Sequence, residues 1–284
     1  MTRTDQQTRH QAEQQTDQQQ VSYAVSRDGT ELAYFTSGVG PPLLLIHGCA
    51  GDHSRWDTLR AHLDPWFTVH AMDRRGRGAS GDAADYAVER EYEDVAAVAE
   101  AIATTASTPV DVYGHSYGGQ VAFGGAPLTA SIRRLVLYEG WPMVDPSAVG
   151  MPQQLVERLE QLLAEDDHEG LVETLFRDAV GSTEEELATV RAQPSWPNRV
   201  AAAHTIPREL RAEPLFDADS ASRVTVPTLL LVGGDAPERF QPEPLTQTLP
   251  DVRVAQLSGQ EHEADIVAPE LVAEQLVAFL RDDV

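Results

Sequence analysis

The chain has 284 residues, 42% of them hydrophobic, with 45 acidic and 21 basic residues for a formal net charge of −24, and its one cysteine is Cys49. A potential this negative argues against nucleic acid and anionic membranes as partners, and a single cysteine excludes an internal disulfide. The length suffices for one large core, with or without a smaller appended domain, and no apolar run approaches the roughly 20 residues that span a bilayer.

All of the basic residues are arginine, because the chain contains no lysine. Two hypotheses explain this composition: the charges merely keep an ordinary protein dissolved, or the chain is adapted to high salt, where a Debye length of roughly 3 Å at 1 M screens self-repulsion. The missing lysine favours the halophilic hypothesis. The first residues show no basic-then-apolar segment, so we expect no signal peptide and a cytoplasmic location.

The first 20 residues contain eight glutamines and almost no apolar side chains. Such a segment cannot bury enough surface to offset the entropy of ordering, so residues 1–20 are predicted to form a disordered tail. The pattern changes at Val21. Residues 21–25 alternate, Asp28-Gly29 is typical of a tight turn, and residues 31–35 form the second strand of the predicted hairpin.

Apolar runs follow at intervals and predict strands that are mostly buried on both faces. They lie at residues 43–46, 67–72, 110–113, 135–138, 228–232 and 252–257. Helical spacing between the runs is clearest over residues 92–105 and 269–280. Strands alternating with helices predict βαβ units, and therefore an α/β fold with a mostly parallel sheet.

One long segment interrupts the alternation. Between Tyr138 and Thr228 the sequence shows no comparable strand, only helical patterns at residues 155–163, 171–180 and 184–192. So long an insertion between two strands of one sheet must form a separate layer. We expect a core at residues 21–140 and 226–284, with a helical cap at 141–225 over the carboxyl ends of the strands.

The most informative motif is Gly114-His115-Ser116-Tyr117-Gly118, which lies between a predicted strand and a helix starting near Gly119. A G-x-S-x-G sequence in this context is typical of a nucleophile elbow, whose serine adopts a strained backbone conformation with its hydroxyl in a cleft. The motif predicts that Ser116 is a nucleophile.

A serine needs a base to remove its proton, and the base needs an acid to orient it. Of the nine histidines, His262 follows the last predicted strand and precedes the final helix, so it should meet Ser116 where loops after strand ends gather. Two acids are candidates. Asp235 follows the penultimate strand, whereas Glu139 ends the strand after the elbow, where a buried carboxylate needs a partner such as His262.

The oxyanion of the reaction requires two backbone N–H groups. One is expected from Tyr117, and the other from Cys49 in the small-residue loop that follows the run at residues 43–46. The Cys49 thiol is a less favoured nucleophile, because the loop already explains its position. No Cys and His residues cluster at metal-ligand spacing, so no metal site is expected.

Together these motifs resemble the α/β-hydrolase superfamily, over roughly residues 21–281. The resemblance rests on His47-Gly48, on Asp73-Arg74-Arg75-Gly76-Arg77-Gly78, on the elbow at Ser116 and on His262. It implies an eight-stranded, mostly parallel sheet with helices on both faces. It also implies a helical cap inserted after the strand that follows the nucleophile helix, and a cofactor-free serine mechanism.

The acid departs from the common pattern of that superfamily. In many members the acid stands three residues beyond the glycine that ends the penultimate strand, which is Ala236 here, so Asp235 is one residue early. Some related enzymes carry the acid at the end of the strand after the elbow. The resemblance therefore favours Glu139 as the first choice, with Asp235 as the alternative.

The predicted activity is hydrolysis of a small carboxylic ester, thioester or lactone through an acyl-enzyme. A C–C bond hydrolase, an aminopeptidase or a cofactor-free haloperoxidase would use the same triad, and a non-catalytic ligand binder or sensor is an alternative from another class. The expected partner is a small molecule. Candidates for the pocket wall, for which packing of the cap is the commoner explanation, are Trp141, Met143, Trp196 and Phe216.

Overall fold

The computed structural model describes residues 20–142, 151–212, 216, 218–234, 240 and 242–282. The candidate acid Asp235 and the pocket candidate Met143 lie outside the described residues. The predicted tail lies outside them as well except for Gln20, which is the first residue of strand β1 rather than part of a tail.

The core of the molecule is an eight-stranded sheet in the order β1-β2-β4-β3-β5-β6-β7-β8. β2 runs antiparallel to both of its neighbours, β1 and β4, and all other neighbours are parallel. The prediction of a mostly parallel, eight-stranded sheet is confirmed. The strands are β1 (Gln20–Val25), β2 (Glu31–Gly38), β3 (Pro42–Ile46), β4 (Thr68–Met72), β5 (Val110–His115), β6 (Ile132–Tyr138), β7 (Thr228–Gly233) and β8 (Val252–Leu257).

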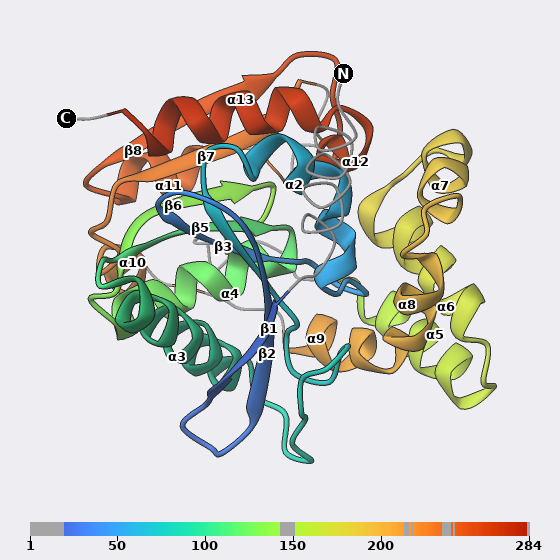
Figure 1. Ribbon diagram of the computed structural model, residues 1–284. Helices are drawn as coiled ribbons and strands as arrows, with labels where there is room; N and C mark the ends of the chain where they lie inside the picture. The colour runs from blue at the N-terminus through green and yellow to red at the C-terminus, as the bar shows by residue number, and fades with distance from the viewer. Residues whose placement is uncertain are drawn as a thin grey trace, which may run out of the picture.

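Helices cover both faces of this sheet (Figure 1). The helices of the core are η1 (His53–Trp56), α2 (Asp57–Leu63), α3 (Val88–Ala106), α4 (Tyr117–Gly125), η2 (Ala126–Leu128), α10 (Ala218–Ala221), α11 (Glu243–Thr248), α12 (Ala264–Val267) and α13 (Pro269–Leu280).

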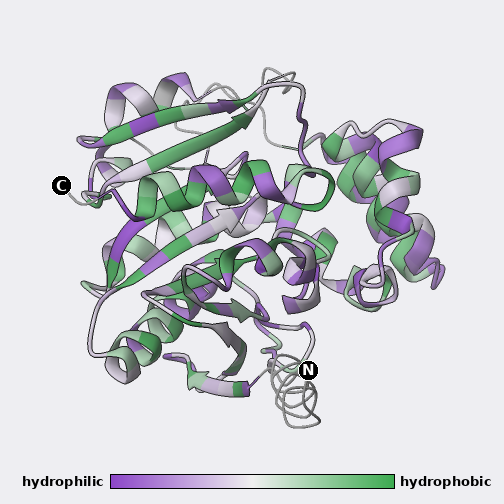
Figure 2. Ribbon diagram, turned by 45° about the horizontal axis from the view of Figure 1, so that its top comes forward, coloured by the Kyte–Doolittle hydropathy of each residue, from purple (hydrophilic) through white to green (hydrophobic). Residues whose placement is uncertain are grey.

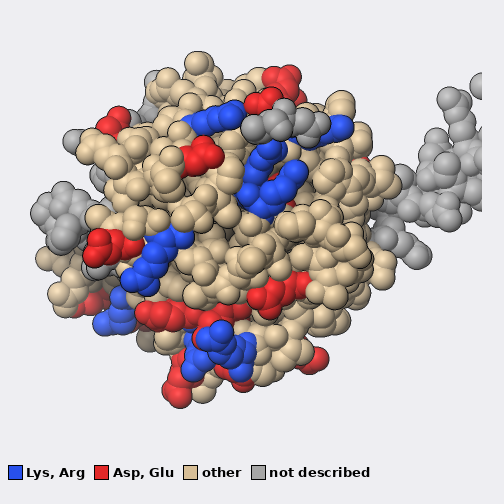
Figure 3. Space-filling model, turned by 90° about the vertical axis from the view of Figure 1, so that its left-hand side faces the viewer, with Lys and Arg blue, Asp and Glu red and all other residues tan. Residues whose placement is uncertain are grey.

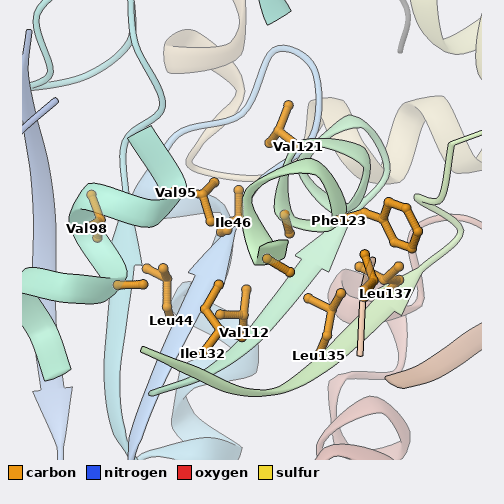
Figure 4. Packing of buried hydrophobic residues seen from close by; sticks show 14 of the residues in the cluster. Leu44, Ile46, Val95, Val98, Val112, Val121, Phe123, Ile132, Leu135 and Leu137 are labelled. Atoms are coloured by element: carbon orange, nitrogen blue, oxygen red, sulfur yellow. The ribbon is translucent and has the colours of Figure 1, made fainter. Parts of the chain in front are cut away.

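Side chains of β3 alternate between two hydrophobic layers. Leu44 and Ile46 pack with α3 and α4 on one face, and Leu43 and Leu45 pack with α2 and α13 on the other. All four side chains are fully buried, as expected for a strand covered on both faces. Figure 4 shows the α3 and α4 layer from close by, and Figure 2 shows hydrophobic residues along much of the central strands.

A group of helices inserted between β6 and β7 forms a cap layer, which lies to the right of the sheet in Figure 1. It has its own hydrophobic cluster, in which Leu159, Leu171 and Ile206 are buried. The predicted helical cap is thus confirmed as part of the fold, whereas its domain boundaries stay a prediction. The cap layer comprises α5 (Gln153–Ala164), α6 (His168–Thr174), η3 (Leu175–Val180), α7 (Glu184–Arg191), α8 (Trp196–Ala201), η4 (Ala203–Thr205) and α9 (Ile206–Arg211).

The cap layer differs from the sequence prediction in its details. The single helix expected over residues 171–180 is instead α6 followed by η3, one turn of π-helix that ends at Gly181 with φ of +83°. Such π turns are frequent at functional sites. The short helices α8 and α9 each carry a proline in their first turn, and they are too brief for a helical period to stand out in the sequence.

Positively and negatively charged side chains are partly mixed on the surface. On the face drawn in Figure 3, arginines lie beside acidic side chains, and the described residues there form no extended basic patch. Within the described parts of the chain, no helix has both the length and the apolar character needed to cross a membrane.

Candidate active site

Ser116 lies at the turn from β5 into α4, as the elbow motif predicts. Its φ of +53° and ψ of −132° fall in a region that side chains with a Cβ rarely adopt. The Ser116 N–H donates to the carbonyl oxygen of Tyr138 over 3.0 Å, which fixes the elbow to the end of β6. The strained turn is therefore held by the sheet itself.

The elbow packs tightly against two other loops, which contain His47 and Gly140. A Cβ on Gly118 would overlap the carbonyl oxygen of His47, and a Cβ on Gly119 would overlap that of Gly140. Glycine is required at both positions because backbone passes where a side chain would stand. The packing sets Ser116 beside both the His47 loop and the end of β6.

Glu139 and His262 meet directly, although 123 residues separate them. The His262 Nδ1–H donates to Glu139 Oε2 over 2.7 Å, and the Gly233 N–H donates to Glu139 Oε1 over 2.7 Å. Glu139 is 1% exposed and His262 is 7% exposed. With Nδ1 protonated, Nε2 is the nitrogen free to accept a proton. The structure thus gives Glu139 the partner that its burial demands.

Several contacts hold the His262 loop in place. The His115 Nε2–H donates to the carbonyl oxygen of His262 over 2.8 Å, and the Tyr138 hydroxyl donates to that of Glu261. The ring of Phe240 stacks on the imidazole at 4.9 Å between centroids. Burial and the nearby positive charge of Arg55 hold the pKa of His115 well below its usual value, so His115 is a neutral donor.

Arg55 of η1 anchors the residues that follow His262. Its Nη1–H donates to Glu263 Oε2 over 3.0 Å and its Nη2–H to Asp265 Oδ2 over 2.6 Å. All three side chains are buried. Sequence analysis missed this cluster, because its partners lie about two hundred residues apart. The one available signal was the pair of acids directly after His262.

The two predicted oxyanion donors flank Ser116. Tyr117 is the first residue of α4, and Cys49 follows Gly48, where an added Cβ would lie 2.8 Å from the Ser116 Cβ. Neither backbone N–H donates to another described residue. Burial, reinforced by the charge of Glu209, raises the pKa of the Cys49 thiol well above its usual value. The thiol is therefore a poor source of thiolate.

His47 and Arg74 shape the loop that carries Cys49. The His47 Nδ1–H donates to the carbonyl oxygen of Gly48 over 2.8 Å, while His47 Nε2 accepts the Arg74 N–H over 3.2 Å. Burial, with Arg74 and Arg77 nearby, holds the pKa of His47 well below its usual value. A neutral imidazole with one donor and one acceptor fits this arrangement.

A buried ionic network joins the cap layer to this loop. Glu209 of α9 is fully buried and accepts from Arg74 Nη2 over 2.9 Å and from Arg77 Nη2. Arg74 also donates to both oxygens of Glu91 over 2.7 Å. Such a network ties the position of α9 to the loops of the core.

Removal of one member should leave an uncompensated buried charge. We expect Glu209→Ala to lower the free energy of unfolding by about 3–5 kcal/mol, because Arg74 and Arg77 lose a shared acceptor. Urea denaturation followed by circular dichroism measures the change. The matched control is Glu160→Ala, which removes an exposed glutamate of the cap layer paired with Arg211 and should cost about 1 kcal/mol or less. Equal losses in the two variants would contradict this assignment.

A cavity of about 350 Å³ connects these groups, and it is lined by Ser116, His262, Glu139, Gly48, Cys49 and Tyr117 together with residues of the cap layer. Its volume lies at the small end of ligand pockets. Of the four candidates for the pocket wall, Trp141 lines the cavity and also packs in the core cluster with α3 and α4. Trp196 instead belongs to the core of the cap layer, where its indole N–H donates to Glu169, and Phe216 packs on Tyr92 and Phe123.

Two clusters in the described part of the chain bring possible metal ligands together, namely His115, His262 and Glu263, and Asp52, His53 and Asp73. In the first, Arg55 and Arg199 lie near Glu263 and would repel a cation. In the second, the Asp73 carboxylate already accepts three N–H groups, from His53 and Ala79. Neither set is free to bind a metal, and the absence of a cofactor stays a prediction.

The sequence and the fold both match known proteins. A family model described as "Alpha/beta hydrolase family" matches residues 43–275. Among solved structures, an alpha/beta hydrolase from Sphaerobacter thermophilus DSM 20745 is 34% identical with a TM-score of 0.77, covering 91% of this chain and all of that one.

Two curated relatives carry more specific names. The (E)-2-((N-methylformamido)methylene)succinate hydrolase of Acinetobacter baylyi is 26% identical over 87% of this chain and 93% of its own length. The pimeloyl-[acyl-carrier protein] methyl ester esterase of Nitrosomonas europaea is 29% identical over 70% of this chain and 78% of its own length. The names of these two relatives both describe hydrolases, and they differ in the substrate.

Proposed function

The chain belongs to the alpha/beta hydrolase family and is a hydrolase, and from that premise we propose that it cleaves small carboxylic esters, thioesters or lactones. Ser116 is the nucleophile of the proposed reaction, His262 the general base and Glu139 the acid that orients it. The proposed oxyanion hole consists of the Cys49 and Tyr117 N–H groups.

One observation carries the proposal: the 2.7 Å hydrogen bond between His262 and Glu139 at a cavity that Ser116 also lines. A carboxylate on Nδ1 keeps the imidazole in the tautomer whose Nε2 can accept a proton, and it stabilises the imidazolium that forms. The strained backbone of Ser116 supports the same assignment, because strain of this kind is retained at functional sites.

In the first half of the reaction Ser116 Oγ attacks the substrate carbonyl as its proton passes to His262 Nε2. The negative charge on the former carbonyl oxygen is stabilised by the N–H groups of Cys49 and Tyr117, which have no acceptor among the described residues. Collapse of the tetrahedral intermediate breaks the bond to the leaving alcohol or thiol, which takes the proton from His262.

In the second half, water gives a proton to His262 Nε2 and attacks the acyl-enzyme carbonyl. The same oxyanion hole holds the second tetrahedral intermediate. Its collapse breaks the bond to Ser116 Oγ, which recovers the proton from His262, and the acid product leaves. No residue beyond the three proposed is required to balance protons.

The alternatives differ in how well the cavity suits them. An aminopeptidase would need an acceptor for the ammonium group of its substrate, and the Arg199 guanidinium in the cavity wall supplies only donors. A C–C bond hydrolase or a cofactor-free haloperoxidase would use the same three residues, and analysis of products separates these reactions from ester cleavage. A ligand binder or sensor would need no reactive serine.

A fluorophosphonate probe tests the proposal. We expect one adduct per chain on Ser116, found by peptide mass spectrometry, because only a serine activated by a base attacks phosphorus readily. The measurement is made in dilute buffer and in molar salt, since a net charge of −24 can require screening. Heat-denatured protein is the control. Folded protein that stays unlabelled in both buffers would contradict catalysis by Ser116 and support a binding function.

A further inference from the structure

Arg199, on helix α8 of the cap layer, is an unusual arginine in the wall of the proposed active site. Its side chain is 2% exposed, yet its Nε and Nη2 atoms have no hydrogen-bond partner among the described residues. The nearest carboxylate, that of Glu263, lies 3.8 Å from Nη2, which is too far for a hydrogen bond. Arg55, by contrast, is equally buried and donates to two carboxylates.

The neighbours explain why Arg199 lacks an acceptor. Glu263 is bound by Arg55 Nη1 over 3.0 Å, and Asp265 is bound by Arg55 Nη2 over 2.6 Å. The two arginines and the two acids cancel in formal charge, so Arg199 lacks acceptor atoms rather than a counter-charge. The missing acceptors have to come from whatever fills the cavity.

The surroundings and the charge of the Arg199 guanidinium indicate which chemical group can accept its hydrogen bonds. Its central carbon atom, Cζ, lies over the Phe176 ring at 5.5 Å from the ring centroid, a contact that uses none of the N–H donors in a conventional hydrogen bond. Burial, with Arg55 nearby, lowers the pKa of Arg199 to about 10, so the side chain is still charged at neutral pH. A planar, charged fork of donors matches a carboxylate in two parallel hydrogen bonds.

Beside Arg199 the wall carries Arg55 and Glu263, which are bonded to each other, and the apolar side chains Leu175, Phe176 and Ala179 of the π turn. Asp178 also lines the cavity but is exposed. A small pocket that combines apolar side chains with one buried cation lacking hydrogen-bond acceptors is suited to a short chain that ends in an anionic group.

We propose that the substrate of this hydrolase carries a carboxylate, which Arg199 binds through two hydrogen bonds while Ser116 attacks the scissile carbonyl. This inference rests on the proposed function of Ser116 and adds the chemical class of the substrate. Selection works because a neutral analogue leaves the guanidinium desolvated and unpaired, whereas the carboxylate satisfies it.

The test compares matched esters that differ at one end. p-Nitrophenyl hydrogen glutarate carries the carboxylate, and p-nitrophenyl glutaramate replaces it with a neutral amide of similar size. For the wild-type protein we expect a kcat/KM about 10- to 100-fold higher for the carboxylate ester, mostly through KM. A second pair, acetyl esters of 4-hydroxybenzoate and 4-hydroxybenzamide, places the carboxylate on the alcohol side. A preference in either pair supports the proposal, and a ratio near 1 in both overturns it.

Variants connect the preference to Arg199. Arg199→Met should abolish the ratio between the paired esters, and Arg199→Lys should keep part of it, because lysine supplies charge without the planar fork. The matched control is Arg211→Met, which removes an exposed arginine from the same cap layer and should keep the wild-type ratio. A wild-type ratio in Arg199→Met would overturn the proposal.

Failure of this inference can be told from failure of the proposed function. Labelling of Ser116 by the fluorophosphonate with no preference for the carboxylate esters would contradict only the role of Arg199. If Ser116 is not labelled and no ester is cleaved, titration calorimetry with glutarate and glutaramide still decides the anion site. Tighter binding of glutarate that Arg199→Met removes supports it, and equal binding overturns it.

Discussion

Replacement of Ser116 by alanine is expected to lower kcat for the best ester substrate by about 10⁴- to 10⁶-fold, because the covalent route is lost. The substitution removes only Oγ, while the backbone at φ of +53° and the hydrogen bond from Ser116 N–H to Tyr138 are kept. KM should change little if Oγ contributes mainly to the transition state. Initial rates with the wild-type and variant proteins, corrected for spontaneous hydrolysis, measure the effect.

Cys49 supplies the comparison, since its thiol is the other candidate nucleophile at the site. Cys49→Ala removes the thiol but retains the backbone N–H of the proposed oxyanion hole, so we expect kcat to fall by less than about tenfold. The raised pKa of the half-buried thiol gives the reason, because little thiolate forms at neutral pH. A large loss in Cys49→Ala together with activity in Ser116→Ala would identify the thiol as the nucleophile.

The sheet could be predicted because its strands carry their own signal. Leu43, Leu44, Leu45 and Ile46 are all fully buried, and a run of apolar residues that short can be buried on both faces only in a central strand. The run at residues 252–257 also forms a strand, β8, although Val254 and several other side chains of this edge strand are exposed. Local pattern and tertiary structure agree in these elements.

The residues that support the site could not be predicted in the same way. Arg199 and Glu209 lie on short helices, where a charged residue is normally taken to face solvent. Their burial depends on partners in other loops: Glu209 meets Arg74 and Arg77 only after the cap layer has packed on the core. No period within α8 or α9 carries that information.

Glu139 shows how much of the candidate site can be predicted from the sequence. The cost of burial predicts that Glu139 needs a partner, and the structure supplies His262 at 2.7 Å. The sequence leaves Asp235 open, because loops that follow the carboxyl ends of parallel strands are all expected at the same edge of the sheet. The contact of His262 with Glu139 depends on the path of the His262 loop, which Arg55 and Tyr138 hold through contacts that the sequence does not reveal.

A paired substitution distinguishes the two acids in solution. Glu139→Gln is expected to lower kcat by about 10⁴-fold, because the amide N–H₂ facing His262 Nδ1 favours the tautomer that is protonated on Nε2 and cannot act as a base. Asp235→Asn makes the same chemical change at the other candidate and should alter kcat by less than about tenfold. Initial rates across a range of pH measure both variants.

The structure also separates a catalytic loss from a structural one. The side chain in the Glu139→Gln variant retains a carbonyl oxygen able to accept the Gly233 N–H that Glu139 Oε1 accepts now, so the junction of β6 and β7 keeps its hydrogen bond. The thermal midpoint of Glu139→Gln should therefore stay close to that of the wild type while turnover collapses. A collapse in Asp235→Asn with turnover intact in Glu139→Gln would assign the acid to Asp235 and leave Glu139 as a residue that only positions the strand ends.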